Sequence, residues 1–272
     1  VVNTALAQSP APVQQTLVPP YPEPKTQSNQ VLLAEHRWVV PPPRHDPAAF
    51  ITNLKNGDTV VSPFVVQFGM SLWGIAPAEH SHARTGHHHL LVDTALPIPP
   101  NASLPFTKNY VHFGKGQMQT VLDLPPGKHT LRLLLADHNH VPHMVYSDEV
   151  TVTVSQRDPE KAEQLKKIEP ALSFPNLKDG DVVHSTFKVQ FHAASLNVSN
   201  KLTKIPDTGY FQLKITPATG RVEKIAFPGG QTETWLKLPE GDYKLQLEFV
   251  KNPTGELHPV VSKITSIKVS GR

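Results

Sequence analysis

A run of six residues occurs twice in this chain, as NLKNGD at 53–58 and as NLKDGD at 176–181. Further matches follow each copy in the same order. They pair 64–68 with 187–191, 85–86 with 208–209, and 122–127 with 236–241. Because turns and apolar positions recur together, the sequence predicts that one fold is present twice.

The pattern inside each copy indicates what that fold is. In the first copy, short apolar runs alternate with turns rich in Gly, Pro and Asn, and helical periodicity is rare. The predicted strands lie at 51–54, 64–68, 87–92, 110–113, 118–124, 129–136 and 149–154. Seven strands with such turns favour an immunoglobulin-like sandwich. We therefore expect an all-β protein of two tandem immunoglobulin-like sandwiches.

Four segments follow from this pattern. An extended Pro-rich tail at 1–49 precedes the first sandwich at 50–154, and the second sandwich spans 171–272. Between them, 155–170 reads as a short helical linker. Asp158 is placed to cap that helix, with Pro159 at its first position.

Composition limits the cellular location, the metal sites and the binding partners that we expect. The chain has no Cys, so disulfides and thiolate metal sites are excluded, and an Ala5-Leu6-Ala7 run resembles a signal-peptidase site. We expect a periplasmic, exported protein. The net charge of +3 is too dilute for nucleic-acid binding, and no apolar run is long enough for a membrane helix. A Pro-rich tail is ordered when it lies on a partner, so we expect residues 1–49 to contact another protein.

The two copies differ most in their histidines. In the first copy, 87–89 is HHH where the second has YFQ at 210–212. His112 aligns with Ala226, and the DHNH run at 137–140 aligns with KNPT at 251–254. The second copy keeps the turns and loses the imidazoles. The fold therefore does not require them, which favours a binding site.

Strand order in such a sandwich predicts where the histidines lie. If 110–113 is strand D, nine of the ten histidines between 50 and 154 fall at one pole. Within a strand, His87 and His89 share a face, so they are the first candidate metal ligands. The other candidates are His112, His138, His140, His143, Asp137, Met70, Met118 and Met144. Imidazole with thioether suits copper, and imidazole with carboxylate suits zinc as second choice.

Each of these residues also has a structural interpretation. A His-rich loop is often a solvated surface, each Met is a common core residue, and Asp137 is suited to capping a turn. His129 is expected at the opposite pole, in a structural role.

Four motifs of the first copy are distinctive. They are GHHHLLVD at 86–93, HFGKGQ at 112–117, LPPGKHTL at 124–131 and DHNHVPH at 137–143. On these motifs the copy resembles a family of exported bacterial domains of unknown function. The resemblance implies an exported sandwich with a His-rich pole, and it implies no activity.

Two functions fit these observations. The first is a non-catalytic periplasmic accessory subunit that docks on a membrane-bound complex, such as a photosynthetic or respiratory electron-transfer complex. The alternative is a periplasmic copper-binding or copper-delivery protein that uses the His/Met pole. An enzyme is not expected, because no nucleophile–base pair or acidic dyad accompanies the histidines.

Overall fold

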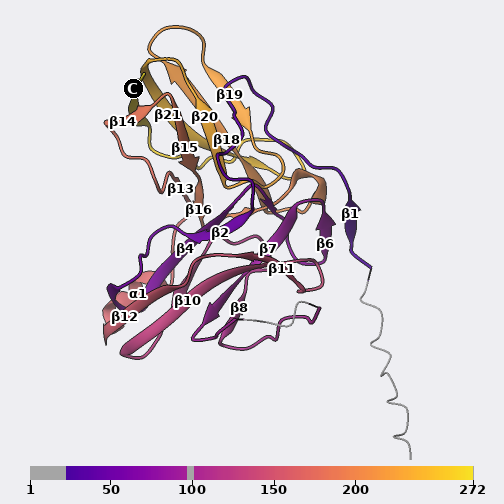
Figure 1. Ribbon diagram of the computed structural model, residues 1–272, viewed down its shortest axis with the longest axis vertical. Helices are drawn as coiled ribbons and strands as arrows, with labels where there is room; N and C mark the ends of the chain where they lie inside the picture. Colours follow the sequence, from indigo (N-terminus) through magenta and orange to yellow (C-terminus); the bar gives the residue numbers. More distant parts are fainter. Residues whose placement is uncertain (1–22, 97–100, 272) are drawn as a thin grey trace, which may run out of the picture.

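The computed structural model describes residues 23–96 and 101–271. These residues form two β-sandwiches, and the α-helix that connects them in sequence lies beside β12 (Val150–Arg157) of the first sandwich, as Figure 1 shows. The all-β fold and its tandem duplication are confirmed. The connecting helix α1 (Pro159–Leu165) begins where the sequence predicts, because the Asp158 side chain accepts hydrogen bonds from the backbone N–H groups of Glu160 and Lys161.

The first sandwich contains eleven strands between Ala48 and Arg157. They are β2 (Ala48–Ile51), β3 (Asp58–Ser62), β4 (Phe64–Ser71), β5 (Gly74–Ile75), β6 (His80–His82), β7 (Thr85–Val92), β8 (Tyr110–His112), β9 (Gln119–Leu122), β10 (Gly127–Ala136), β11 (Pro142–Tyr146) and β12 (Val150–Arg157). One sheet has the order β3-β12-β10-β7, with β5 and β8 also paired to β7. The opposite sheet is β2-β4-β9.

The core of the first sandwich lies between these sheets. Phe68 of β4, Leu90 of β7 and Leu133 of β10 are fully buried there. Their neighbours in sequence point to the other face of each sheet, as the two-residue period of a strand requires. The outer face of β7 and β10 has a smaller apolar cluster that includes Leu91 and Leu134.

The second sandwich repeats this arrangement. Its elements are β13 (Ala171–Ser173), β14 (Asp181–His184), β15 (Thr186–Gln190), β16 (His192–Ala194), β17 (Asn197–Val198), the 3-10 helix η1 (Lys201–Thr203), β18 (Thr208–Pro217), β19 (Glu223–Ala226), β20 (Glu233–Lys237), β21 (Gly241–Lys251) and β22 (Thr265–Ser270). The order β14-β22-β21-β18 matches β3-β12-β10-β7, and β19 pairs with β18 as β8 pairs with β7.

One strand differs from expectation. Residues 110–113 were predicted as strand D, which would belong to the sheet of β4. Strand β8 instead pairs antiparallel with β7, so that His112 lies opposite His89. The difference matters for the site, because it brings His112 to the outer face of the β7 sheet through backbone pairing.

The core of the second sandwich extends to a few buried residues of the first, at the joint between the two. Met70, Ile75 and Met118 of the first sandwich belong to the same buried cluster as Val198 and Phe227 of the second. Both Met side chains are therefore part of the interdomain joint.

Backbone hydrogen bonds also cross the joint. Ile75 N donates to Gly230 O (2.9 Å), Asn200 N donates to Ile75 O (2.8 Å), and Val198 N donates to Gly116 O (2.8 Å). A joint with backbone pairing and a dry core holds the two sandwiches in one arrangement.

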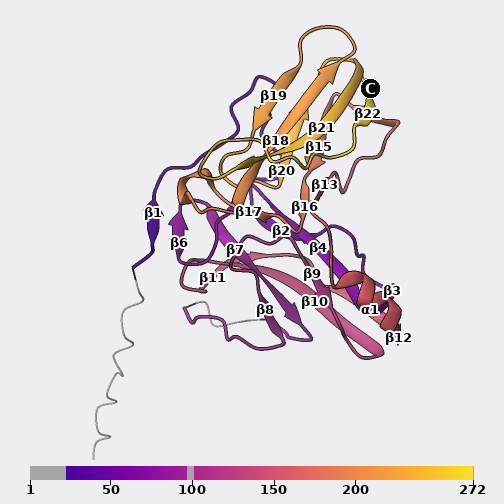
Figure 2. The ribbon, with the colours of Figure 1, turned by 180° about the vertical axis from the view of Figure 1, so that it is seen from behind.

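The tail was expected to lie on another chain. Its described part, from residue 23, instead lies on this one. β1 (Thr26–Ser28) pairs in parallel with β6, and Val40 N then donates to Trp235 O of the second sandwich (3.0 Å). Figure 2 shows this segment passing from β1 along the second sandwich before it returns to β2. The predicted partner contact of 1–22 lies outside the described residues.

No helix in the described ranges has the length and apolarity that crossing a membrane requires.

We predict that the joint is sensitive to Gly116→Ala. Gly116 has a φ of +91°, and a Cβ there would lie 2.0 Å from Val198 O. We expect a loss of about 2 kcal/mol or more in the free energy of unfolding, measured with urea. Gly57→Ala is the matched control, since its φ is +90° and nothing lies within 4 Å of a Cβ. Equal losses in the two variants would show that the close approach to Val198 has no energetic importance.

We predict a pH-dependent contribution from His192, which is 1% exposed and hydrogen-bonded through Nε2 to Gln119 Oε1 (2.9 Å) across the joint. Burial lowers the pKa of His192 to about 4. The unfolded chain therefore binds more protons below pH 6.5, so stability falls as the pH falls toward 4.

The test compares the wild-type protein with His192→Gln at pH 7.5 and pH 5. The amide can still donate to Gln119 but does not titrate. The free energy of unfolding should fall less in the variant, by about 2 kcal/mol, from a pKa difference of about 2.5 units. Identical pH dependence in both proteins would contradict the assignment.

Candidate metal centre

Strand β7 places consecutive imidazoles on opposite faces of its sheet. His88 points into the sandwich core, where its ring lies 5.0 Å from that of Phe68. His87 and His89 share the outer face, and their Nε2 atoms are 3.1 Å apart. The prediction that these two form a pair is matched by the geometry.

Two further imidazoles meet this pair from other elements. His112 lies opposite His89 in the β7–β8 register, and the two ring centroids are 5.0 Å apart. His140 follows β10, and its Nε2 lies 3.2 Å from Nε2 of His112. Its ring centroid is 5.0 Å from that of His87. Four imidazoles from three separate stretches of sequence thus face one another.

The separations suit a metal ion. One ring nitrogen from each of His87, His89 and His112 lies within 4.8 Å of the other two. Nitrogens bound at about 2.0 Å are roughly 2.9 Å apart at adjacent square-planar positions and about 3.3 Å apart in a tetrahedron. The Nε2 separations of 3.1 and 3.2 Å fall between these values. We refer to these three residues and His140 as the histidine cluster.

Burial keeps the inner imidazoles neutral. His87 is 0% exposed and His89 is 1% exposed. Burial, assisted by the neighbouring imidazoles, holds the pKa of His87 well below its usual range and lowers that of His89 to about 3. Burial also lowers the pKa values of His112 and His140. A neutral imidazole has a free lone pair, which a metal ligand requires.

The cluster has an incomplete outer hydrogen-bond shell. The Nδ1 atoms of His87 and His89 are buried and have no hydrogen-bond partner within the described part of the chain. Metal-bound imidazoles commonly donate their second N–H to an oxygen. This arrangement departs from that pattern, which reduces the basicity of both ligands.

Asp137 shapes the turn that contains His140. Its Oδ1 accepts hydrogen bonds from Asn139 N (2.8 Å) and Val141 N (2.9 Å). His140 adopts a φ of +65°, which an ordinary residue rarely takes without such support. Asp137 is thus a positioning residue and is not among the grouped ligand atoms, in agreement with the turn-capping alternative.

The other predicted ligands lie outside the cluster. His143 packs on Trp73, with ring centroids 4.9 Å apart, and the side chain of His138 bonds with that of its neighbour Asn139. Met70 and Met118 are buried in the joint. Met144 is 58% exposed, and its sulfur accepts a hydrogen bond from the Tyr146 hydroxyl. The combined imidazole and thioether site is therefore not formed.

The histidine cluster does not lie where the sequence predicts. The histidines were predicted at a pole of the sandwich, whereas the cluster lies on the outer face of the β7 sheet. The segment before β8 lies over it, and the ring of Phe106 is 5.2 Å from His112 and 4.9 Å from His140. Phe106 was not predicted, and nothing in its local sequence marks it.

His129 has the structural role that was predicted. Its Nδ1 lies 2.8 Å from Asp93 Oδ2 and its Nε2 lies 2.9 Å from Pro125 O. Burial alone would lower the pKa of His129, but the bonds to Asp93 and Pro125 outweigh it and raise the pKa. In the second sandwich the Tyr243 hydroxyl donates to Pro239 O in the same place (2.9 Å).

The second sandwich fills the equivalent sheet face differently. Gln212 lies opposite Ala226 in the β18–β19 register, as His89 lies opposite His112. Gln212 Nε2 donates to Glu248 Oε2 (2.7 Å), and Lys224 Nζ donates to the same oxygen (2.9 Å). Gln212, at the position of His89, therefore belongs to a hydrogen-bonded polar network.

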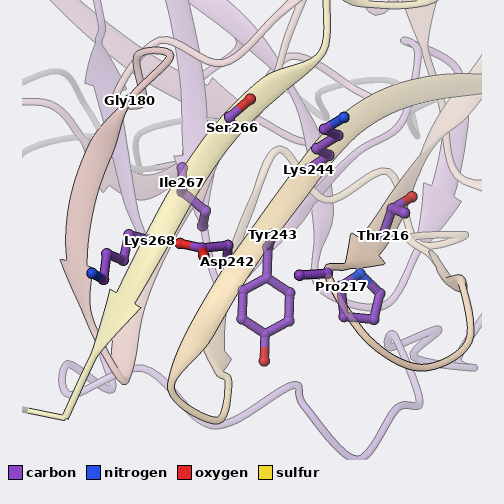
Figure 3. Close-up of a pocket in the computed structure, with 10 residues that line it drawn as sticks. Gly180, Thr216, Pro217, Asp242, Tyr243, Lys244, Ser266, Ile267 and Lys268 are labelled. Carbon is purple, nitrogen blue, oxygen red and sulfur yellow. The ribbon is translucent and has the colours of Figure 1, made fainter.

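A separate cavity of about 480 Å³ lies on the second sandwich (Figure 3). Its lining includes Tyr243, Lys244 and Lys268 and contains no histidine. Figure 3 shows the two lysine side chains on neighbouring strands, with Tyr243 near the turn that follows β18. This cavity is distinct from the histidine cluster.

Comparison with solved structures finds similarities at low sequence identity, fibronectin type III modules among them. The fibronectin(III)-like modules of CbhA from Clostridium thermocellum are 11% identical, with a TM-score of 0.24 over 82% of this chain and 94% of that chain. Latent dimeric PorU from Porphyromonas gingivalis is 12% identical, with a TM-score of 0.30 over 83% of this chain and 20% of that chain. A two-domain fibronectin type III segment of chicken tenascin is 13% identical, with a TM-score of 0.20 over 81% and 96%.

No curated protein matches the sequence. A family model does match, and it matches twice, at residues 66–155 and 189–270. The two matched ranges coincide with the two sandwiches, which confirms both the resemblance and the internal repeat. The protein is therefore a member of the DUF4399 family of domains of unknown function, with two copies of that domain in one chain.

Proposed function

We propose that the first sandwich is a non-catalytic metal-binding module, and that its ion is Cu(II), with Zn(II) as second choice. The observation that supports this most directly is the convergence of Nε2 atoms from His87 with His89 and from His112 with His140, at 3.1 and 3.2 Å. An all-imidazole site without thioether or thiolate favours Cu(II) over Cu(I). For nitrogen ligands Cu(II) also binds more tightly than Zn(II).

The second sandwich supports the same proposal. It has the same strand register, but Tyr210, Gln212 and Ala226 stand at the positions of His87, His89 and His112, and Gln212 is hydrogen-bonded to Glu248. The cluster is thus no requirement of the fold. Buried imidazoles that stay neutral keep a lone pair available for coordination, which suits a metal-binding role.

We expect the wild-type protein to bind one Cu(II) per chain, with nitrogen hyperfine structure in its electron paramagnetic resonance spectrum. His87→Ala with His89→Ala should weaken binding by more than about 100-fold, since loss of a mere outer-shell partner costs 10–100-fold. His45→Ala with His184→Ala is the matched control, because it removes two exposed imidazoles outside the cluster. Equal Cu(II) affinity in the two double variants, by isothermal titration, would remove the assignment.

A periplasmic accessory role is the second candidate, and it is compatible with metal binding. The observation that favours it is the exposure of apolar side chains on the tail, with Leu33 54% exposed. In this role the joined sandwiches would form a rigid platform that docks on a membrane-bound complex.

In this role, Leu33→Glu should cause a severalfold decrease in the amount of protein that sediments with the membranes of the cells that express it. His45→Glu, which places the same charge on another exposed tail position, should not. If wild-type protein remains wholly in the soluble periplasmic fraction, the accessory role is wrong.

A further inference from the structure

The histidine cluster is geometrically asymmetric. His87, His89 and His112 form one compact group of ligand atoms. His140 is not in this group: its ring lies near those of His112 (4.8 Å between centroids) and His87 (5.0 Å), and farther from that of His89 (5.8 Å). Three imidazoles therefore define the position of an ion, and the fourth approaches it from one side.

The scaffold is asymmetric in the same way. His87 and His89 lie in the middle of β7, which pairs with β10 on one side and β8 on the other. His140 lies on the turn between β10 and β11. The turn is held by the Asp137 carboxylate, by backbone bonds from Asp137 N to Val141 O (2.9 Å) and from His140 N to Asp137 O (3.0 Å), and by Leu104 N, which donates to His140 O (2.9 Å). None of these bonds lies within a strand ladder. Turn residues reorganise at lower cost than paired strand residues.

The four histidines also differ in their exposure to solvent. His87 and His89 are almost fully buried, whereas His112 and His140 are only partly buried. The ring of Phe106, which is 66% exposed, lies on the rings of His112 and His140. The side of the cluster with His112 and His140 is thus the more exposed one, and an incoming ligand would approach the ion from that side.

We infer that His140 is the exchangeable ligand of the site, and that the metal leaves by substitution at this position. This inference rests on the proposed metal-binding function. In the exchange, the bond from the ion to His140 Nε2 breaks as a bond forms to an imidazole nitrogen of an acceptor. No electron is transferred, and both imidazoles remain neutral. His87, His89 and His112 hold the ion until the acceptor has bound.

Asp137 sets the rate of this exchange. Its two hydrogen bonds keep His140 at a positive φ, with the ring turned toward His112. Asp137 touches no ligand atom of the grouped triad, so it acts through the turn. Loosening the turn should accelerate release and leave the Cu(II) spectrum of the loaded site unchanged.

The decisive experiment is rescue by free imidazole. His140→Gly is expected to fold, because glycine readily adopts a φ of +65°. Its Cu(II) spectrum should differ from wild type and return to it when millimolar imidazole is added. His87→Ala should show no such recovery, since the space left by His87 is buried. An unchanged spectrum in His140→Gly, or a changed one that imidazole does not restore, would overturn the inference.

Release kinetics provide the second measurement. Cu(II) transfer to a chelator should be at least about 10-fold faster in Asp137→Ala than in wild type, with a smaller effect in Asp137→Asn, whose amide oxygen can still accept. Equal transfer rates in Asp137→Ala and wild type would contradict the role of the turn. A wild-type protein that binds no Cu(II) would instead refute the proposed function, so the two failures are distinguishable.

Discussion

The pairing of β7 with three neighbouring strands determines most of this architecture. Its register with β10 and β8 places His89 between Leu134 and His112. The alternation of side chains along the strand then separates His88, which packs in the core, from His87 and His89 on the outer face. The histidine cluster is thus a product of sheet register, and the adjoining turn adds only His140.

Register alone does not explain why imidazoles occupy these positions. An unpartnered buried polar group costs about 1–3 kcal/mol, and His87 and His89 each have one such nitrogen among the described residues. The second sandwich avoids this cost in the same register, with Gln212 and Lys224 both bonded to Glu248. The same register thus accommodates either buried imidazoles or a hydrogen-bonded polar group, so the imidazoles are not required by the fold.

The sequence predicted the correspondence between the two copies, but not the sheet of residues 110–112 or the roles of two Met residues. The alignment of His89 with Gln212 and of His112 with Ala226 was correct, because matching turns fix the register of matching strands. The prediction that residues 110–113 join the sheet of β4 was wrong. A three-residue strand after a long connection has too few residues for its alternation of apolar and polar side chains to indicate a partner. The roles of Met70 and Met118 depend on contact between the two copies, which no pattern within one copy reveals.

The joint and the cluster are connected through one short strand. Ile75 of β5 pairs with Gly86 of β7, the residue before His87, and its backbone also bonds to Gly230 and Asn200 of the second sandwich. The beginning of β7, which carries His87 and His89, is therefore anchored on both sandwiches. In both ribbon views β8 lies on the side of the first sandwich that faces away from the second (Figures 1 and 2). The second copy thus supports the strand that carries His87 and His89, and it does not cover the side of the first sandwich on which β8 lies.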